Sequence, residues 1–207
     1  MSNEQEKIED LLTELDNLEH PLHEYFDKIV RHKTRHFKID LIYISAIDRS
    51  LALTYGFTTL IRSQNFQAAA HLVRLHLDNF LRLFAMTLVD DKEDFAQKFH
   101  SGIEIRKILD RDKEPMSDGY LKRRATEKHD WIDKVYTTTS GYVHLSRQHV
   151  MNSLRFVDLG KQLIEHSVGK TDRHVPDKAK IDATECMIAI TDCLLNLLQD
   201  WSQERND

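Results

Sequence analysis

The chain of 207 residues is poor in turn-forming and cross-linking residues, because it holds 6 glycines, 3 prolines and 2 cysteines. So few turn-formers cannot supply the many tight connections of a β-sandwich or a β-barrel. Cys186 and Cys193 lie close together on one apolar stretch, which excludes a disulfide framework and a cysteine-rich zinc site. We therefore expect a reduced, cytoplasmic, helical protein.

Other absences concern membranes, nucleic acids and cofactors. The longest uncharged apolar stretch is too short for a transmembrane helix, and the first sixteen residues are acidic rather than a basic secretion signal. We therefore expect no membrane partner. The net charge of −5 gives no general attraction to a phosphate backbone, so RNA or DNA would need a local basic patch. No cofactor is expected, since the chain lacks a glycine-rich phosphate loop and a Gly-x-Ser-x-Gly motif.

Several long segments of the sequence show the apolar periodicity of α-helices. Apolar residues recur at spacings of three and four through several long segments, with no internal repeat or flexible linker between them. We expect helices at Ser2–Leu18, Leu22–Arg31, Lys38–Gln64, Phe66–Val89, Glu93–Ser101, Trp131–Met151 and Lys180–Trp201. Residues 154–168 fit either a short helix or an extended piece. The prediction is an all-α fold, a single bundle of about six to eight helices with two or three long ones.

The whole chain, residues 1–207, is expected to form one domain. Within it, residues 1–36 would be an N-terminal helical appendage, residues 37–168 the core, and residues 177–202 a terminal core helix. The first and last helices present more apolar surface than a small bundle should leave exposed. This surplus predicts a homodimer.

The helix expected over residues 66–89 carries the most informative pattern. Its polar residues fall within an arc of roughly 80° on a helical wheel, while most of the remaining surface is apolar; they are Gln67, His71, Arg74, Asp78 and Arg82. The spacing of four lets Asp78 bridge both arginines. Two interpretations stay open. The stripe either faces solvent or faces a buried polar cleft, whose surplus positive charge would attract a further carboxylate or an anionic ligand.

Two other segments are candidates to complete such a cleft. In the preceding helix, Arg49 lies next to Asp48 on a seam of mostly small residues, a pattern that favours close helix packing or a network with the stripe. In a later segment, a helix would place Ser140 and His144 on one side. A histidine near a serine and an arginine can act as a general base or bind an anion, and it can equally be a packing residue.

Histidine is abundant, with 12 residues, so histidine motifs must be compared with chance. No histidine has a glutamate three residues before it, which excludes a carboxylate-bridged di-iron site, and His-Glu-x-x-His is absent. No metal site is expected. HEPN ribonucleases carry an arginine, four to six residues and then a histidine, and this chain has three such matches, at residues 31–36, 123–129 and 124–129. Chance predicts roughly two, so the matches alone carry little information. His36 is the better candidate, because it adjoins a long apolar helix within a basic cluster.

The pattern as a whole resembles a loosely defined group of uncharacterised bacterial helical proteins. In that group Arg-x-x-x-Asp-x-x-x-Arg precedes Ser-x-x-x-His, here Arg74–Asp78–Arg82 and Ser140–His144, and the resemblance covers roughly residues 40–149. Some of its members are similar to HEPN bundles. The resemblance therefore implies metal-free RNA cleavage or nucleotide binding of a defence or toxin–antitoxin type.

Two classes of function follow for this chain. In the first, His144 or His36 is the acid–base catalyst, and the anion- or ligand-binding residues are Arg74, Asp78, Arg82, Arg49, Ser140 and His71. In the second, the protein is a non-catalytic interaction or regulatory bundle whose polar groups specify helix packing. A basic cleft at a dimer seam would favour the first class, and full mutual neutralisation in a closed core would favour the second.

Overall fold

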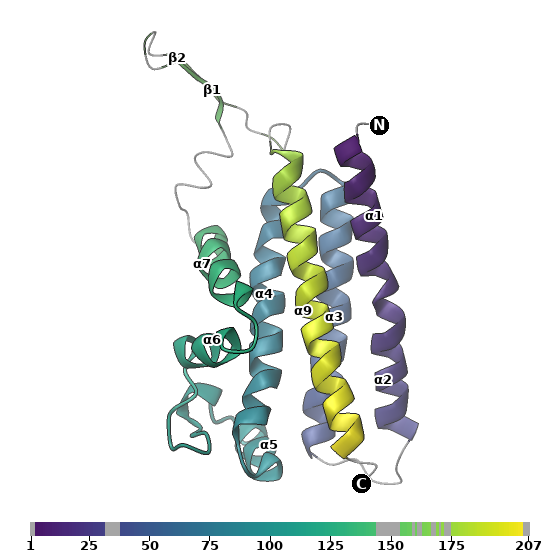
Figure 1. The fold of residues 1–207 in the computed structure, drawn as a ribbon, viewed down its shortest axis with the longest axis vertical. Helices are drawn as coiled ribbons and strands as arrows, with labels where there is room; N and C mark the ends of the chain where they lie inside the picture. The colour runs from purple at the N-terminus through teal and green to yellow at the C-terminus, as the bar shows by residue number, and fades with distance from the viewer. Residues whose placement is uncertain are drawn as a thin grey trace.

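The computed structural model describes residues 3–31, 38–143, 154–158, 160, 163–166, 169, 171 and 175–204. The α-helices are α1 (Asn3–Asn17), α2 (Glu19–Arg31), α3 (Lys38–Arg62), α4 (Phe66–Ala85), α5 (Lys92–His100), α6 (Asp118–Thr126), α7 (Trp131–Val143) and α9 (Asp177–Glu204). Two single turns of 3-10 helix are η1 (Met86–Leu88) and η2 (Ile105–Lys107). The helices pack as one bundle (Figure 1), which confirms the all-α prediction.

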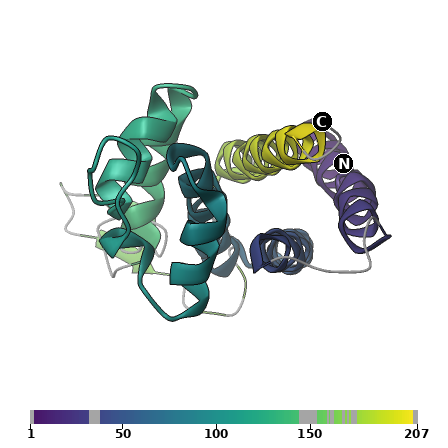
Figure 2. The ribbon, with the colours of Figure 1, turned by 90° about the horizontal axis from the view of Figure 1, so that it is seen from below.

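The helices form two groups that meet at α4. In the first, α3, α4, α9 and the consecutive pair α1–α2 run side by side along the long axis of the molecule (Figure 1). In the second, α6 and α7 pack on the other side of α4, as the view along the bundle shows (Figure 2), while α5 packs on α3 next to η1. Because α4 contacts helices of both groups, its side chains include many of the buried ones. Phe80 and Phe84, for example, are buried and stack with ring centroids 5.8 Å apart.

The turn from α3 into α4 shows how local sequence places the central helix. Gln64, two residues after the end of α3, adopts a positive φ of 57°. Asn65 then accepts a hydrogen bond from the Ala68 backbone N–H at 3.2 Å. This hydrogen bond makes Asn65 the N-cap of α4. Farther along, α3 approaches α4 closely at Gly56, where a Cβ atom would lie 3.3 Å from Leu72 Cδ1.

The apolar faces of α1 and α9 cover each other. Ile8, Leu12 and Leu15 of α1 are buried, and α1 packs directly on α9. The homodimer was predicted from the assumption that these two faces are exposed. That argument no longer holds for the described residues, and the homodimer itself stays a prediction.

Several segments differ in detail from the expected helices. The break between α1 and α2 falls at Leu18, before Pro21, which lies in the first turn of α2, where proline is tolerated. The segment with Pro115 and Gly119 contains α6, which the sequence pattern did not predict. Within 154–168, Leu154–Asp158 (β1) and Leu163–His166 (β2) pair as antiparallel strands, so these described residues are extended rather than helical. Among the described residues, no helix is long and apolar enough to span a membrane.

Candidate functional site

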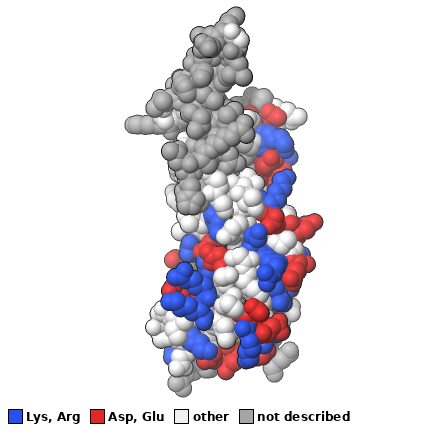
Figure 3. Space-filling model, turned by 90° about the vertical axis from the view of Figure 1, so that its left-hand side faces the viewer, with Lys and Arg blue, Asp and Glu red and all other residues white. Residues whose placement is uncertain are grey.

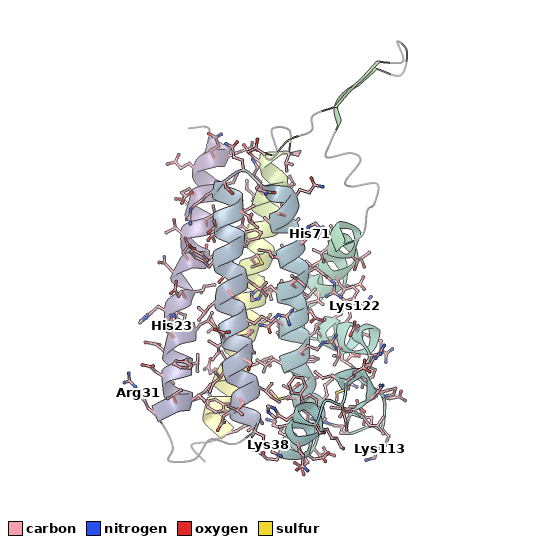
Figure 4. The ribbon with its side chains drawn as sticks, turned by 180° about the vertical axis from the view of Figure 1, so that it is seen from behind. His23, Arg31, Lys38, His71, Lys113 and Lys122 are labelled. Atoms are coloured by element: carbon pink, nitrogen blue, oxygen red, sulfur yellow. The ribbon has the colours of Figure 1, made fainter. Side chains whose placement is uncertain are left out.

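The polar stripe of α4 faces the second group of helices. At its upper end, Arg74 lies over the ring of Tyr136 on α7, with the guanidinium carbon 3.9 Å from the ring centroid. Lys122 of α6 approaches the same ring at 5.5 Å. Figure 4 shows His71 on α4 beside α7 and Lys122 on α6, with His23 on the far side of the bundle. The stripe is therefore largely a seam between helices.

Arg74 does not join Asp78 in the way that the spacing predicted. Within the described residues it makes no ion pair, and its buried Nη1 has no hydrogen-bond partner. The guanidinium of Arg74 makes a cation–π contact with the ring of Tyr136 instead. Ser140, one turn beyond Tyr136, donates its hydroxyl hydrogen to the Tyr136 carbonyl at 2.7 Å. His71 Nδ1 donates to the carbonyl of Gln67 at 2.7 Å, so both side chains bond locally.

The lower end of the stripe lines an open cleft of about 590 Å³, here called the polar cleft. Its walls come from α3, α4, α5, η2 and α6. The side chains of Phe95 and Phe99 form an apolar part of the wall, and Phe99 is partly exposed. The charged residues that line it are Arg49, Asp78, Arg82, Glu104, Arg106 and Asp118.

Arg82 is the centre of the ion pairs in the polar cleft. Its Nη2 lies 3.1 Å from Asp78 Oδ1 and 2.5 Å from Asp118 Oδ1. The side chains of Asp78 and Arg82 are 25% and 31% exposed, so the group is neither fully solvated nor buried. Asp118 is the further carboxylate that a surplus of arginine was expected to attract. It stands at the start of α6, next to the capping residue Ser117.

Arg49 is held much more loosely. The side chain is 47% exposed, and its nearest carboxylate oxygen, Asp78 Oδ2, lies 4.0 Å away. Arg49 donates no hydrogen bond to any other residue that the structure describes. Its guanidinium therefore has free donors that face the cleft.

The opposite wall of the polar cleft carries a second, self-contained ion-pair group. Glu104 binds both Arg106 and Lys107 at 2.6 Å. The hydrogen bond from Lys107, helped by the charge of Arg106, holds the pKa of Glu104 below its ordinary value. With Asp78 and Asp118 opposite Arg49 and Arg82, the lining charges of the cleft balance. Over the described part of the face toward α5, α6 and α7, basic and acidic side chains are interleaved (Figure 3).

His76 is a buried polar residue that sequence reasoning missed. It lies on α4 with no exposed surface, and its Nε2 is 2.9 Å from Thr191 Oγ1 on α9. Thr191 donates its own hydroxyl hydrogen to the Met187 carbonyl, so Nε2 of His76 must carry the proton. Burial, reinforced by the positive charge of Arg49, lowers the pKa of His76 to about 3. His76 is therefore a neutral residue that packs in the core. Its position outside the polar arc of α4 was the feature of the sequence that could have predicted its burial.

The remaining sequence candidates are placed as follows. His36 and His144 lie outside the described residues, so the acid–base role predicted for them stays a prediction. In the described ranges, no three His, Cys, Asp or Glu residues are arranged to hold a metal ion. Cys186 and Cys193 are free thiols whose pKa values burial raises to about 11, which makes them poor nucleophiles.

Comparison with protein-family models, with curated proteins and with solved structures gives no match. The polar cleft must therefore be judged by its own geometry and charges.

Proposed function

We propose that the chain is a nucleotide-binding helical bundle that holds the phosphate of its ligand in the polar cleft. The observation that carries the proposal is Arg49, whose guanidinium is half exposed, faces the cleft and donates no hydrogen bond to another described residue. Arginine binds phosphate through two parallel N–H donors. A volume of about 590 Å³ is in the range of small-molecule sites.

The neighbouring groups give each part of a nucleotide a place. Arg82 is fixed by Asp78 and Asp118, so it does not have to be ordered when the ligand binds, but these two carboxylates already offset its charge. Arg106 is well exposed and can turn from Glu104 toward a phosphate. The exposed ring of Phe99 is a surface on which a base can stack.

Isothermal titration calorimetry with AMP, adenosine and inorganic phosphate tests this assignment. AMP should bind, and Arg49→Ala should weaken its binding at least about tenfold, because a hydrogen bond to a charged group is lost. Arg62→Ala is the matched control, since Arg62 pairs with Glu9 and Asp16 outside the cleft. No heat with millimolar AMP or phosphate, or equal affinity for AMP in the Arg49→Ala variant, would reject nucleotide binding here.

Metal-free RNA cleavage is the stronger form of the same proposal. It requires an acid–base residue, for which His144 and His36 are the candidates, and a HEPN-like dimer that brings two copies together. The resemblance of the Arg74–Asp78–Arg82 and Ser140–His144 segments supports it. Digestion of a labelled single-stranded RNA in the presence of EDTA, compared for wild type and His144→Ala, tests cleavage separately from binding. Light scattering tests the homodimer.

A second candidate function is favoured by one observation: the lining charges of the polar cleft balance within the chain. Such a network can serve to hold α6 and η2 on α4, as in a non-catalytic interaction or regulatory bundle. In this case the cleft variants change stability and bind no anion. A cytoplasmic setting fits both proposals, because free thiols persist in reducing compartments.

A further inference from the structure

A second cavity of about 560 Å³ lies between α4, α7 and α9 and is here called the apolar groove. It shares no lining residue with the polar cleft. Side chains from all three helices form its surface, among them Ala70, Val73, Trp131, Val135, Ala183 and Cys186. A ligand of the apolar groove is therefore expected to be a hydrocarbon group rather than a phosphate.

Small residues explain why this space stays open. Both α7 and α9 pack on α4, and Ala70 of α4 faces the groove together with Ala179, Ala183 and Ala189 of α9. Alanine leaves room that a leucine would fill. Ala70 and Val73 are buried, whereas Trp131 and Ala183 are only partly covered. The groove thus keeps apolar surface accessible to water, which an apolar ligand would cover.

One cation at the mouth of the groove has no partner among the described residues. Lys134 of α7 lines the groove and makes no ion pair or hydrogen bond there. The other charges of the lining are paired: Lys178 with Asp182 at 2.9 Å, and Glu185 with Lys7 at 3.0 Å. The aliphatic stem of a lysine can lie on apolar surface while its ammonium stays in water. The mouth therefore offers one free positive charge.

We propose that the apolar groove binds a fatty carboxylate, with the hydrocarbon chain between α7 and α9 and the carboxylate at Lys134. The volume suits a single chain of medium length and is within the range of small-molecule sites. One free ammonium beside a continuous apolar surface matches a ligand with one anionic head and one tail. The high pKa of the Cys186 thiol, raised by burial, is consistent with an apolar interior.

Trp131 gives this proposal a direct optical test, because it lines the groove. The other tryptophan, Trp201, is buried, and its ring lies tilted against that of Tyr43 with centroids 5.2 Å apart. Fluorescence of the wild type and of Trp201→Phe is titrated with decanoate and dodecanoate below their micelle concentrations. A saturable change of Trp131 emission is expected, with about fifteenfold tighter binding for the longer chain, since it buries two more methylenes. No saturable change with either acid would overturn the proposal.

Two variants test separately the contributions of the carboxylate and of the hydrocarbon chain to binding. Lys134→Met keeps the stem but removes the charge, and should weaken dodecanoate binding about fivefold while leaving dodecanol binding unchanged. Lys98→Met, which alters an ion pair on α5, is the control. Ala183→Phe fills the groove and should abolish the binding of both ligands, with circular dichroism confirming an intact fold.

Three further results would count against a fatty carboxylate. The first is unchanged dodecanoate affinity in Lys134→Met. The second is unchanged affinity in Ala183→Phe. The third is a wild-type dimer that becomes monomeric in Ala183→Phe, which would make the groove an interface between two copies of the chain.

Discussion

Lowering the pH should destabilise the protein through one side chain, His76. The pKa of this histidine is about 3 in the folded protein and 6.5 in the unfolded chain. Between these values the unfolded chain binds a proton that the folded protein excludes. The contribution of His76 to stability is therefore complete above about pH 6.5 and is lost progressively as the pH falls toward 3. Going from about pH 8 to pH 5 should lower the free energy of unfolding by about 2 kcal/mol.

Urea unfolding followed by the circular dichroism of the helices, at several pH values from about 8 to 5, measures this loss. His76→Gln is the informative variant, because the amide keeps a donor toward Thr191 and cannot titrate. The wild type should lose about 2 kcal/mol more than this variant over the interval. His23→Gln is the control, since His23 is exposed and pairs with Glu19 on the surface. Parallel pH curves for wild type and His76→Gln would refute the reasoning.

Three substitutions test the architecture around α4 by the same urea assay. Asp78→Ala should lower the free energy of unfolding by about 1–2 kcal/mol, between the values for exposed and buried ion pairs, because Asp78 is partly exposed beside Arg82. A loss of about 4 kcal/mol or more, the value typical of a buried pair, would show that the group is effectively buried. Leu77→Ala should cost about 2–5 kcal/mol, since the side chain is fully buried, and a neutral effect would contradict the central position of α4. Asn65→Ala should cost about 1 kcal/mol through loss of the helix cap; an unchanged midpoint would mean that the cap contributes nothing.

Much of the fold is predictable because helix periodicity is a local property of sequence. The helices α3, α4 and α9 are long enough for apolar spacing to identify them within a few residues of their ends. In contrast, α6 has nine residues rich in charge. Its stability comes from tertiary contacts, such as the buried Leu121 and the hydrogen bond from Tyr120 to Asp110. No such contact can be read from the segment alone.

The candidate site divides in the same way. The arc with Asp78 and Arg82 is visible in the sequence because it belongs to one helix, whereas Asp118 comes from a segment 36 residues further along the chain. Arg74 shows a second limit. Its spacing from Asp78 favours an ion pair, but Tyr136 of α7 offers a competing surface that only the folded chain brings near. Local spacing predicts which residues can pair, and tertiary structure decides which of them do.

The contact between α1 and α9 has a consequence for the order in which the protein can fold during synthesis. Among the described helices, α1 is made before the others and buries Ile8, Leu12 and Leu15 against α9, which is made after them. Until residues near Trp201 have emerged, these side chains have no native partner on α9. Closure of the core thus waits for nearly the whole described chain, and an apolar face stays open to chaperones or to aggregation in the meantime.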